Sequence, residues 1–332
     1  VRAVNRAIRD GKKVYLTDDG YIVDTPTFAN LLNNFAIYGD ALYKVPQGQA
    51  LKALKVYAPP HQYYWAGVDT PAHTALALKN LGFDIVNTPE EADVIVLESD
   101  NFDKSLLGLK PTIIVGGTAM QRLEKLGVLS GFDAEHFKGG SDYEGLMKAI
   151  IDDADPLTSG YNKNDLFYSN SGNWIAKVPA NFKTLATIAG SNYYIAGWWP
   201  GNENLANKIV AISGSYKDQP MFIYAGNPTN RLHTIHFYRW VSNAIFGSQL
   251  AQLKDLEKEQ KPSTEVVEII NQKPQAGQAT TLRYTPQPQI MNATRKAQLP
   301  QTGNKENQSS LVIASMFILV SGYLLHLKKK EE

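Results

Sequence analysis

Short apolar segments alternate with segments of helical character between residues 54 and 126, and this alternation limits the possible folds most strongly. The apolar segments read LKVYA, FDIVN, ADVIVLE and PTIIVGG. Helices are predicted over 70–82, opening at Thr70-Pro71 and closing at Gly82, and over 118–126. Apolar strands joined by helical crossovers are typical of a parallel sheet covered on both faces. We therefore predict an open α/β domain with a mostly parallel sheet flanked by helices.

Two further elements are predicted ahead of this region. Residues 1–24 indicate a helix that ends at Gly11, followed by a hairpin about the Asp19-Gly20 pair. Glycine favours the left-handed backbone found after a helix, and Asp-Gly is a frequent hairpin turn. A second helix is expected near 28–39.

The second half of the folded region is richer in strands. A helix is expected around 143–151, and the strand-like segments that follow read LFYSN, WIAKV, TLATIA, YYIAGWW, NKIVAIS and MFIYAG. These segments predict an antiparallel extension of the sheet. A last helix is expected over about 230–246, and its apolar side chains are placed to pack on the sheet: Leu232, Ile235, Trp240 and Ile245.

The composition excludes several kinds of chemistry. The 33 basic and 32 acidic residues give a net charge of +1, so no excess charge attracts a phosphate backbone and no nucleic-acid partner is expected. The chain of 332 residues contains no cysteine, which excludes disulfides, thiolate metal sites and any cysteine nucleophile. Its hydrophobic content of 43% is sufficient for a buried core over most of its length.

Three features follow one another near the C-terminal end. The pentapeptide LPQTG comes first and consists of Leu299, Pro300, Gln301, Thr302 and Gly303. A polar stretch separates it from the apolar segment 311–327, which lies at the lower limit of the roughly 17 to 25 residues that cross a bilayer as a helix. Three lysines at 328–330 then provide the charge that is expected on the cytoplasmic side of a membrane.

This arrangement resembles the sorting signal of Gram-positive surface proteins that sortase processes. The resemblance implies cleavage between Thr302 and Gly303 and an amide link from Thr302 to peptidoglycan at the cell wall. Sortase and peptidoglycan are then the partners, and the membrane holds the chain only transiently, before cleavage. The mature protein would keep no transmembrane helix. The alternative is an ordinary membrane anchor that follows a chance pentapeptide.

The stretch 251–298 is dominated by Lys, Glu, Gln, Pro and Thr. Such a composition cannot bury enough apolar surface to offset the entropy of ordering, so we predict a disordered linker that spans the wall. Its first part, 252–260, is placed to extend the preceding helix. At the other end of the chain, 1–10 shows no export signal and position 1 is not Met, so we expect the natural N-terminus to lie upstream.

Three longer segments carry a second resemblance: LKVYAPPHQYYWAGVDTPAHTALALKNLGFDIV (54–86), YYIAGWWPG (193–201) and NPTNRLHTIHFYRWVSNAIFG (227–247). They resemble the class I glutamine amidotransferase-like domain that follows the catalytic module in secreted bacterial zinc carboxypeptidases of the carboxypeptidase A type. The similarity extends over about 1–247. It implies a catalytic module upstream of this chain, with zinc as the cofactor of that module.

The predicted organisation combines both resemblances. Residues 1–50 form the end of the upstream module or a connector, and 51–250 form the amidotransferase-like α/β domain. Residues 251–298 form the linker that spans the wall, and 299–332 form the sorting signal.

No catalytic residue is predicted in this chain. An amidotransferase needs a cysteine on a sharp turn between a strand and a helix, and the turn after PTIIVGG offers only Thr118. No G-x-S-x-G occurs that would supply a serine instead. None of the six histidines is followed by Glu three positions later, so the zinc site of a carboxypeptidase cannot be built here and no metal is expected.

Some side chains nevertheless have the chemistry of ligand-binding groups. The aromatic clusters could form a stacking platform for sugar rings or peptides, although alternating aromatic residues in strands more often belong to a core: Tyr63, Tyr64 and Trp65, and then Tyr193, Tyr194, Trp198 and Trp199. His233 and His236 have the spacing of a helical metal pair, and packing is the alternative. Arg231 could bind a carboxylate at a helix start, or form a cap or a surface ion pair.

The sequence is compatible with three functions. The first is a wall-anchored metallocarboxypeptidase, of which this chain supplies the accessory domain and the anchor. The second is a non-enzymatic adhesin or a glycan- or peptide-binding module. The third is a hydrolase with a nucleophile other than cysteine, for which no triad signature is found.

Overall fold

The computed structural model describes residues 1–17, 20–42, 50–59, 61–62, 69–70, 73–136, 144–170 and 172–259. The chain divides after Thr264 into two units, and the second unit, 265–332, lies outside the described residues. The pentapeptide, the apolar segment 311–327 and nearly all of the predicted linker therefore lie outside them too. Within the part that is described, no helix is long and apolar enough to span a membrane.

Five parallel strands form one half of the main sheet, in the order β16-β8-β7-β3-β6. They are β3 (Lys55–Tyr57), β6 (Asp84–Val86), β7 (Val94–Leu97), β8 (Thr112–Val115) and β16 (Gln219–Tyr224). Every residue of β7 and β8 is buried, as expected for strands that are covered on both faces. Helices α3 (His73–Asn80) and α4 (Gly117–Lys125) confirm the two predicted crossover helices.

An antiparallel extension continues the sheet beyond β16, in the order β11-β10-β13-β15-β16. Its strands are β10 (Glu144–Ile151), β11 (Asn164–Ser169), β13 (Lys183–Ile188) and β15 (Ile209–Tyr216). Outside this order, β14 (Tyr194–Trp198) pairs with β10, and β9 (Asp133–His136) pairs with β12 (Asn173–Lys177), which in turn pairs with β15. The predicted α/β class with an antiparallel extension is confirmed, and the extension contains more strands than the parallel part.

The predicted helix around 143–151 is wrong, because this segment is strand β10. Its burial alternates strictly: Gly145, Met147, Ala149 and Ile151 are buried, while the residues between them are more exposed. This period of two fits a strand that pairs with β11 on one side and with β13 and β14 on the other. Pairing on both edges outweighs the moderate helix propensity of the segment.

Two predicted helices begin at different residues from those expected. Helix α2 (Thr25–Leu32) starts earlier than predicted, because the Asp24 side chain caps it by accepting a hydrogen bond of 2.7 Å from the Thr27 backbone N–H. Helix α5 (Tyr238–Glu259) starts later, because Arg231 and Leu232 have positive φ angles of 48° and 62°. Such angles interrupt a right-handed helix. The predicted extension of this helix past residue 252 is confirmed.

Short 3-10 turns replace the expected start of the last helix. They are η5 (Asn230–Leu232) and η6 (Ile235–Phe237). Ile235, which was expected to pack on the sheet, is 71% exposed, whereas Trp240 and Ile245 are fully buried as predicted. The remaining short elements are β4 (His61–Gln62), β5 (Asp69–Thr70), η1 (Pro89–Glu91), η2 (Lys104–Leu106), η3 (Pro156–Thr158) and η4 (Asn202–Asn204).

The N-terminal elements pack onto the α/β domain. They are α1 (Arg2–Arg9), β1 (Tyr15–Thr17) and β2 (Gly20–Ile22), and β1 and β2 form the predicted hairpin, whose turn residues lie outside the described residues. The Asn5 side-chain amide donates to the Leu81 carbonyl at 2.9 Å. The Tyr21 hydroxyl donates to Oδ1 of Asn243, on α5, at 2.8 Å.

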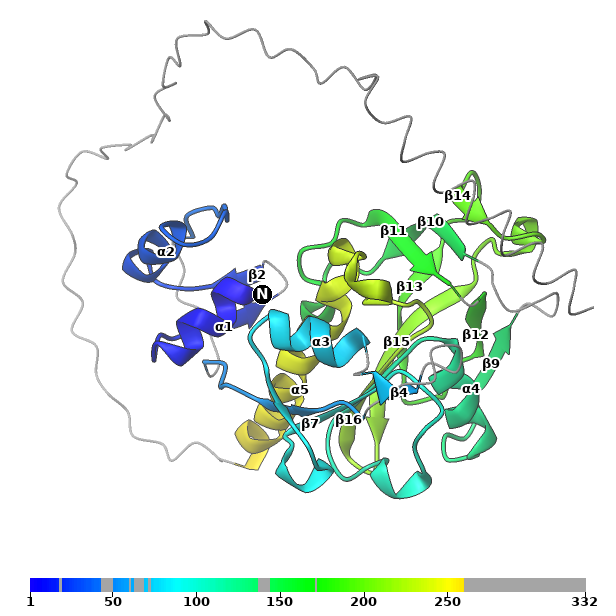
Figure 1. The fold of residues 1–332 in the computed structure, drawn as a ribbon, viewed down its shortest axis with the longest axis horizontal. Helices are drawn as coiled ribbons and strands as arrows, with labels where there is room; N and C mark the ends of the chain where they lie inside the picture. Colours follow the sequence, from blue (N-terminus) through cyan, green and yellow to red (C-terminus); the bar gives the residue numbers. More distant parts are fainter. Residues whose placement is uncertain are drawn as a thin grey trace, which may run out of the picture. The chain divides into compact units, whose positions relative to one another are not determined.

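Helix α5 packs through aromatic rings on strand β16. Trp240 stacks on Tyr224 and Tyr161, with ring centroids 4.9 Å apart in both pairs, and on Phe222 at 6.0 Å. In Figure 1, α5 and α4 lie on opposite sides of the sheet. The two helices therefore cover both faces next to the parallel strands.

Replacing Trp240 by alanine should remove the ring that packs α5 on strand β16. Trp240→Ala is expected to lower the free energy of unfolding by about 3–5 kcal/mol, because a large buried ring is lost and a cavity remains. Chemical denaturation followed by circular dichroism would measure the change. Ile235→Ala, on an exposed position of the preceding turn, is the control and should change the stability by less than about 0.5 kcal/mol. Equal losses in both variants would contradict this description of the core.

Candidate functional site

The turn from β8 into α4 is where an amidotransferase-like domain would carry its nucleophile. Gly116 forms this turn with φ 83° and ψ 159°, and α4 begins at Gly117. A side chain at Gly117 would collide with Asn173, which is buried on the neighbouring strand β12. Thr118, which was considered for this role, lies one residue further, on the exposed side of α4. The turn therefore carries no nucleophilic side chain, and its space is filled by an asparagine.

A polar cluster lies at the carboxyl ends of the parallel strands, where α/β sheets usually bind ligands. Glu98 follows β7 and accepts hydrogen bonds from the backbone N–H of Thr74, at 2.9 Å, and from its hydroxyl. The hydroxyls of Thr74 and Thr229 lie 2.8 Å apart and are buried. These bonds join the start of α3 to the segment after β16. The described groups of this cluster are bonded to one another, so they hold the edge of the sheet together.

A second polar chain connects the antiparallel strands to the same segment. The Tyr168 hydroxyl donates to Oε1 of Glu144 at 2.9 Å and accepts from the Asn230 side-chain amide at 2.8 Å. The Asn170 amide in turn donates to Oδ1 of Asn230 at 2.9 Å. Burial raises the pKa of Tyr168 well above its ordinary value, and the Glu144 carboxylate raises it further. Tyr168 therefore remains a protonated donor at physiological pH.

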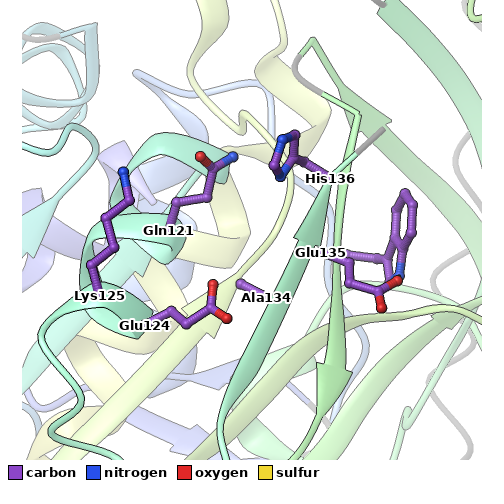
Figure 2. Close-up of a pocket in the computed structure, with 7 residues that line it drawn as sticks. Gln121, Glu124, Lys125, Ala134, Glu135 and His136 are labelled. Atoms are coloured by element: carbon purple, nitrogen blue, oxygen red, sulfur yellow. The ribbon is translucent and has the colours of Figure 1, made fainter. Parts of the chain in front are cut away.

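A cavity of about 530 Å³ lies between α4 and the β9–β12 pair. Its described lining residues are Gln121, Glu124, Lys125, Ala134, Glu135, His136 and Trp174. Figure 2 shows Gln121 and Glu124 extending from α4 toward β9, whereas Glu135 extends from β9 away from α4. Glu135 accepts a hydrogen bond of 3.0 Å from the Trp174 indole N–H. The lining is polar and mixed in charge, so it does not favour a large apolar ligand.

The carboxyl group of Glu124, which lines this cavity, interacts with the carboxyl group of Asp133. Burial raises the pKa of Glu124 above its ordinary value, and the hydrogen bond with Asp133 raises it further. The pKa of Asp133 is lowered, mainly by its hydrogen bond with Lys177, whose Nζ lies 2.9 Å from Oδ2. Glu124 therefore keeps its proton to a higher pH than Asp133 does. No group of three metal-ligating side chains occurs among the described residues.

The aromatic platform predicted around 193–199 is only partly present. Trp198 is 64% exposed, whereas Trp199 is 2% exposed and belongs to the core. Tyr193 is also buried and donates to the Asn202 carbonyl at 2.7 Å, and Tyr194 is half-buried. Including Trp199 in the platform was therefore wrong, because successive residues of strand β14 and its end point to opposite sides. Tyr63, Tyr64 and Trp65 lie outside the described residues.

His233 and His236 are not arranged as a helical metal pair. Helix α5 begins only at Tyr238, so the two imidazoles do not share a helical face. Nε2 of His236 lies 2.7 Å from Oδ1 of Asp165, and its ring contacts Tyr161 edge-on. Arg231 likewise lies in the short 3-10 turn η5 and not at the start of α5. Its backbone N–H donates to Nδ1 of His73 at 3.3 Å.

The C-terminal segment matches a known family model. The LPXTG cell wall anchor motif matches residues 292–332, which include the predicted pentapeptide, apolar segment and lysines. The chain is therefore a cell-wall-anchored surface protein of the Gram-positive type and a sortase substrate. No curated protein matches the sequence.

The α/β domain is similar in structure to proteins of low sequence identity. A GMP synthase subunit from Thermoplasma acidophilum is 16% identical, with a TM-score of 0.41, over 62% of this chain and 98% of that chain. A ThuA-like protein of Parabacteroides merdae is 12% identical, with a TM-score of 0.37, over 65% and 93%. A cytoplasmic protein of Salmonella typhimurium is 12% identical, with a TM-score of 0.35, over 61% and 98%. These likenesses assign no activity to the domain, and the predicted link to zinc carboxypeptidases gains no support from them.

Removing the charge of Glu124 should stabilise the protein at neutral pH. The folded state holds the Glu124 proton more tightly than the unfolded state, so the free energy of unfolding falls as the pH rises above about 4.5. Glu124→Gln is therefore expected to raise the Tm at pH 7 by about 1–2 °C and to change it little at pH 4. Thermal denaturation at both values would measure this. Glu91→Gln, on an exposed turn, is the control, and a lower Tm of Glu124→Gln at pH 7 would contradict the raised pKa of Glu124.

Proposed function

We propose that this chain is the wall-attached, non-catalytic portion of a secreted zinc metallocarboxypeptidase, and that its α/β domain is an accessory domain. The observation that carries the non-catalytic role is the β8–α4 turn, where Gly116 and Gly117 replace any nucleophile and Asn173 fills the space. The complete lack of cysteine agrees with this role. The proposed parent enzyme rests on the sequence resemblance over 1–247.

Sortase attachment explains why the pentapeptide precedes an apolar segment and lysines. We infer that the segment 311–327 and the lysines behind it hold the chain at the membrane while the Thr302 carbonyl is attacked. The bond from Thr302 to Gly303 is then exchanged for an amide bond to a wall amine, and the apolar segment is left behind. Pro300 restricts the backbone ahead of the cleaved bond and favours an extended peptide.

Replacing Thr302 should abolish covalent attachment to the wall. Thr302→Ala is expected to move most of the protein from the wall fraction, which resists hot detergent, into the membrane or medium, because sortase no longer forms its intermediate on this residue. Fractionation of cells and immunoblotting would measure the distribution. Thr294→Ala, in the predicted linker and outside LPQTG, is the matched control. If Thr302→Ala stayed in the wall fraction as completely as the control, the assigned attachment point would be wrong.

The proposed parent enzyme is tested by the coding sequence upstream of residue 1. We expect that sequence to contain a His-x-x-Glu pair and a later His, and the complete protein to bind one equivalent of zinc and to release C-terminal residues from peptides. Metal analysis and a peptide-release assay, with the His of the pair replaced by Ala as control, would measure both. An upstream sequence without these ligands would refute the carboxypeptidase and leave the wall anchor unaffected.

A non-enzymatic binding module is the second candidate. The exposed indole of Trp198 favours it, because a large apolar side chain on a strand is normally buried. In that case the anchor displays a domain whose task is recognition alone. The two candidates differ in what lies upstream of residue 1, and both leave the described domain without chemistry of its own.

A further inference from the structure

Basic side chains are concentrated in residues 1–13. This stretch contains five of the 33 basic residues of the chain, and its single acidic residue is Asp10. All five basic side chains are exposed, and together we call them the basic segment: Arg2, Arg6, Arg9, Lys12 and Lys13. The net charge of the whole chain is only +1, so this local excess is offset in other parts of the sequence. The position of these cations therefore needs an explanation of its own.

Three of the cations form a stripe along helix α1. Arg2, Arg6 and Arg9 are four and then three residues apart, a spacing that places side chains on one face of a helix. Residues from the opposite face are buried, among them Ala3 and Ala7. Helix α1 thus packs on the domain through small apolar side chains and presents its arginines to solvent.

Acidic residues neutralise this stripe only in part. Nε of Arg6 lies 2.8 Å from Oδ2 of Asp10, and Nη2 of Arg9 lies 3.0 Å from Oδ1 of Asp84. The four side chains are between 36% and 65% exposed, and ion pairs in such positions are weak and are screened by salt. Both arginines can therefore leave these partners when an anion offers several contacts at once.

The other three cations have no such partner. Among the residues that the structure describes, Arg2, Lys12 and Lys13 form no ion pair. Arg2 lies in the first turn of α1, where the positive end of the helix dipole disfavours a cation. Lys12 lies directly behind the helix, because its backbone N–H donates to the Ala7 carbonyl at 2.9 Å. The fold gains no stability from the charge of Arg2, which points to a role in binding.

Helix α1 does not have the features of a membrane-binding helix. A helix that lies in the membrane interface buries an apolar face in the lipid and carries its cations on the other face. The apolar face of α1 is already buried against the domain, and no large hydrophobic side chain within 1–17 is exposed. A row of exposed cations on a convex helix surface instead fits an extended polymer whose negative charges repeat along its length.

We propose that the basic segment binds a linear anionic polymer of phosphodiester groups in the cell wall. A guanidinium group bonds to phosphate oxygens through two parallel N–H donors and always remains charged. The wall anchor keeps the segment among such polymers, so that even a weak contact is strengthened by the high local concentration. This goes beyond the proposed function, because it requires the wall anchor and no enzyme upstream.

The first experiment uses the form of the chain that sortase releases. This form ends at Thr302, joined to a short amine, and it lacks the apolar segment 311–327. Calorimetry would measure its binding to poly(glycerol phosphate), and to polyglutamate at equal charge as a carboxylate polymer. We expect tighter binding of the phosphate polymer, and an affinity that falls by at least about 5-fold when salt is raised from about 50 to about 200 mM. Absence of binding at low salt, or equal binding of polyglutamate, would overturn the proposal.

A second measurement separates the polymer from a membrane with the same phosphate chemistry. Vesicles of phosphatidylglycerol present glycerol phosphate groups on a lipid surface. Because α1 has no apolar face left for the lipid, sedimentation with these vesicles should be weaker than binding to the polymer at equal phosphate concentration. Equal or tighter binding to the vesicles would assign the basic segment to the membrane and refute the wall polymer.

A triple variant assigns the binding to the basic segment. Arg2→Gln/Lys12→Gln/Lys13→Gln is expected to weaken binding by about 10-fold or more, because three of the five charges are lost. The matched control makes the same change at three exposed lysines elsewhere: Lys104, Lys148 and Lys217. The strand β10, which carries one of them, lies well away from α1 in Figure 1. Circular dichroism would verify folding, and equal losses in both folded variants would show that only overall charge matters and overturn the proposal.

A change at Asp10 should have the opposite effect. Asp10→Asn removes the carboxylate that pairs with Arg6, so that this guanidinium becomes available to the polymer. Binding is expected to become about 2-fold tighter or more. Asp10 is the C-cap of α1, where the helix dipole disfavours a negative charge, so the variant should remain folded. Unchanged or weaker binding by folded Asp10→Asn would contradict the proposed contact of the arginine stripe with the polymer.

Discussion

Strand β16 lies between the parallel and the antiparallel strands of the sheet, and the arrangement of both sets depends on its pairing. β16 pairs in parallel with β8 on one edge and antiparallel with β15 on the other. Its side chains Phe222 and Tyr224 stack on Trp240 of α5. One strand therefore joins the parallel half to the antiparallel extension and also receives the longest described helix. A slip of one residue in its register would turn both rings away from α5, so the pairing on its two edges and the packing on its face support each other.

The parallel half was predictable from the sequence, because the apolar residues of each strand are sufficient to identify that strand. A strand such as β7 or β8 is buried on both faces and reads as a continuous apolar run, so no knowledge of its neighbours is needed. Segment 144–151 lacks such a run. It mixes Glu144 and Lys148 with small and apolar residues, and only the pairing with β11, β13 and β14 makes it a strand. The late start of α5 could not be predicted from the sequence either. Left-handed backbone angles are expected at glycine, but here they occur at Arg231 and Leu232, which do not indicate them.

The candidate site was predictable only in part, for a similar reason. The aromatic residues around 193–199 are conspicuous in the sequence, but which of them faces solvent depends on the register of β14 against β10. The structure separates Trp198, which is exposed, from Trp199, which is buried. Glu144 and Tyr168 were missed because each is unremarkable in its own segment. They become a pair only when β10 and β11 align, and a sequence pattern could have indicated this only if β10 had been recognised as a strand.

The β8–α4 turn determines how closely the antiparallel strands approach α4. Glycine at 117 allows Asn173 of β12 to approach α4 closely, because any side chain at this position would collide with it. That approach brings β12 and its partner β9 against α4, on the branch of the sheet that does not contain β14. The other branch is where β14 pairs with β10. The packing at the β8–α4 turn and the position of β14 thus depend on different strand pairs. Covalent attachment near one end of the chain keeps the domain at a high local concentration at the wall, so that even weak contacts made there are strengthened.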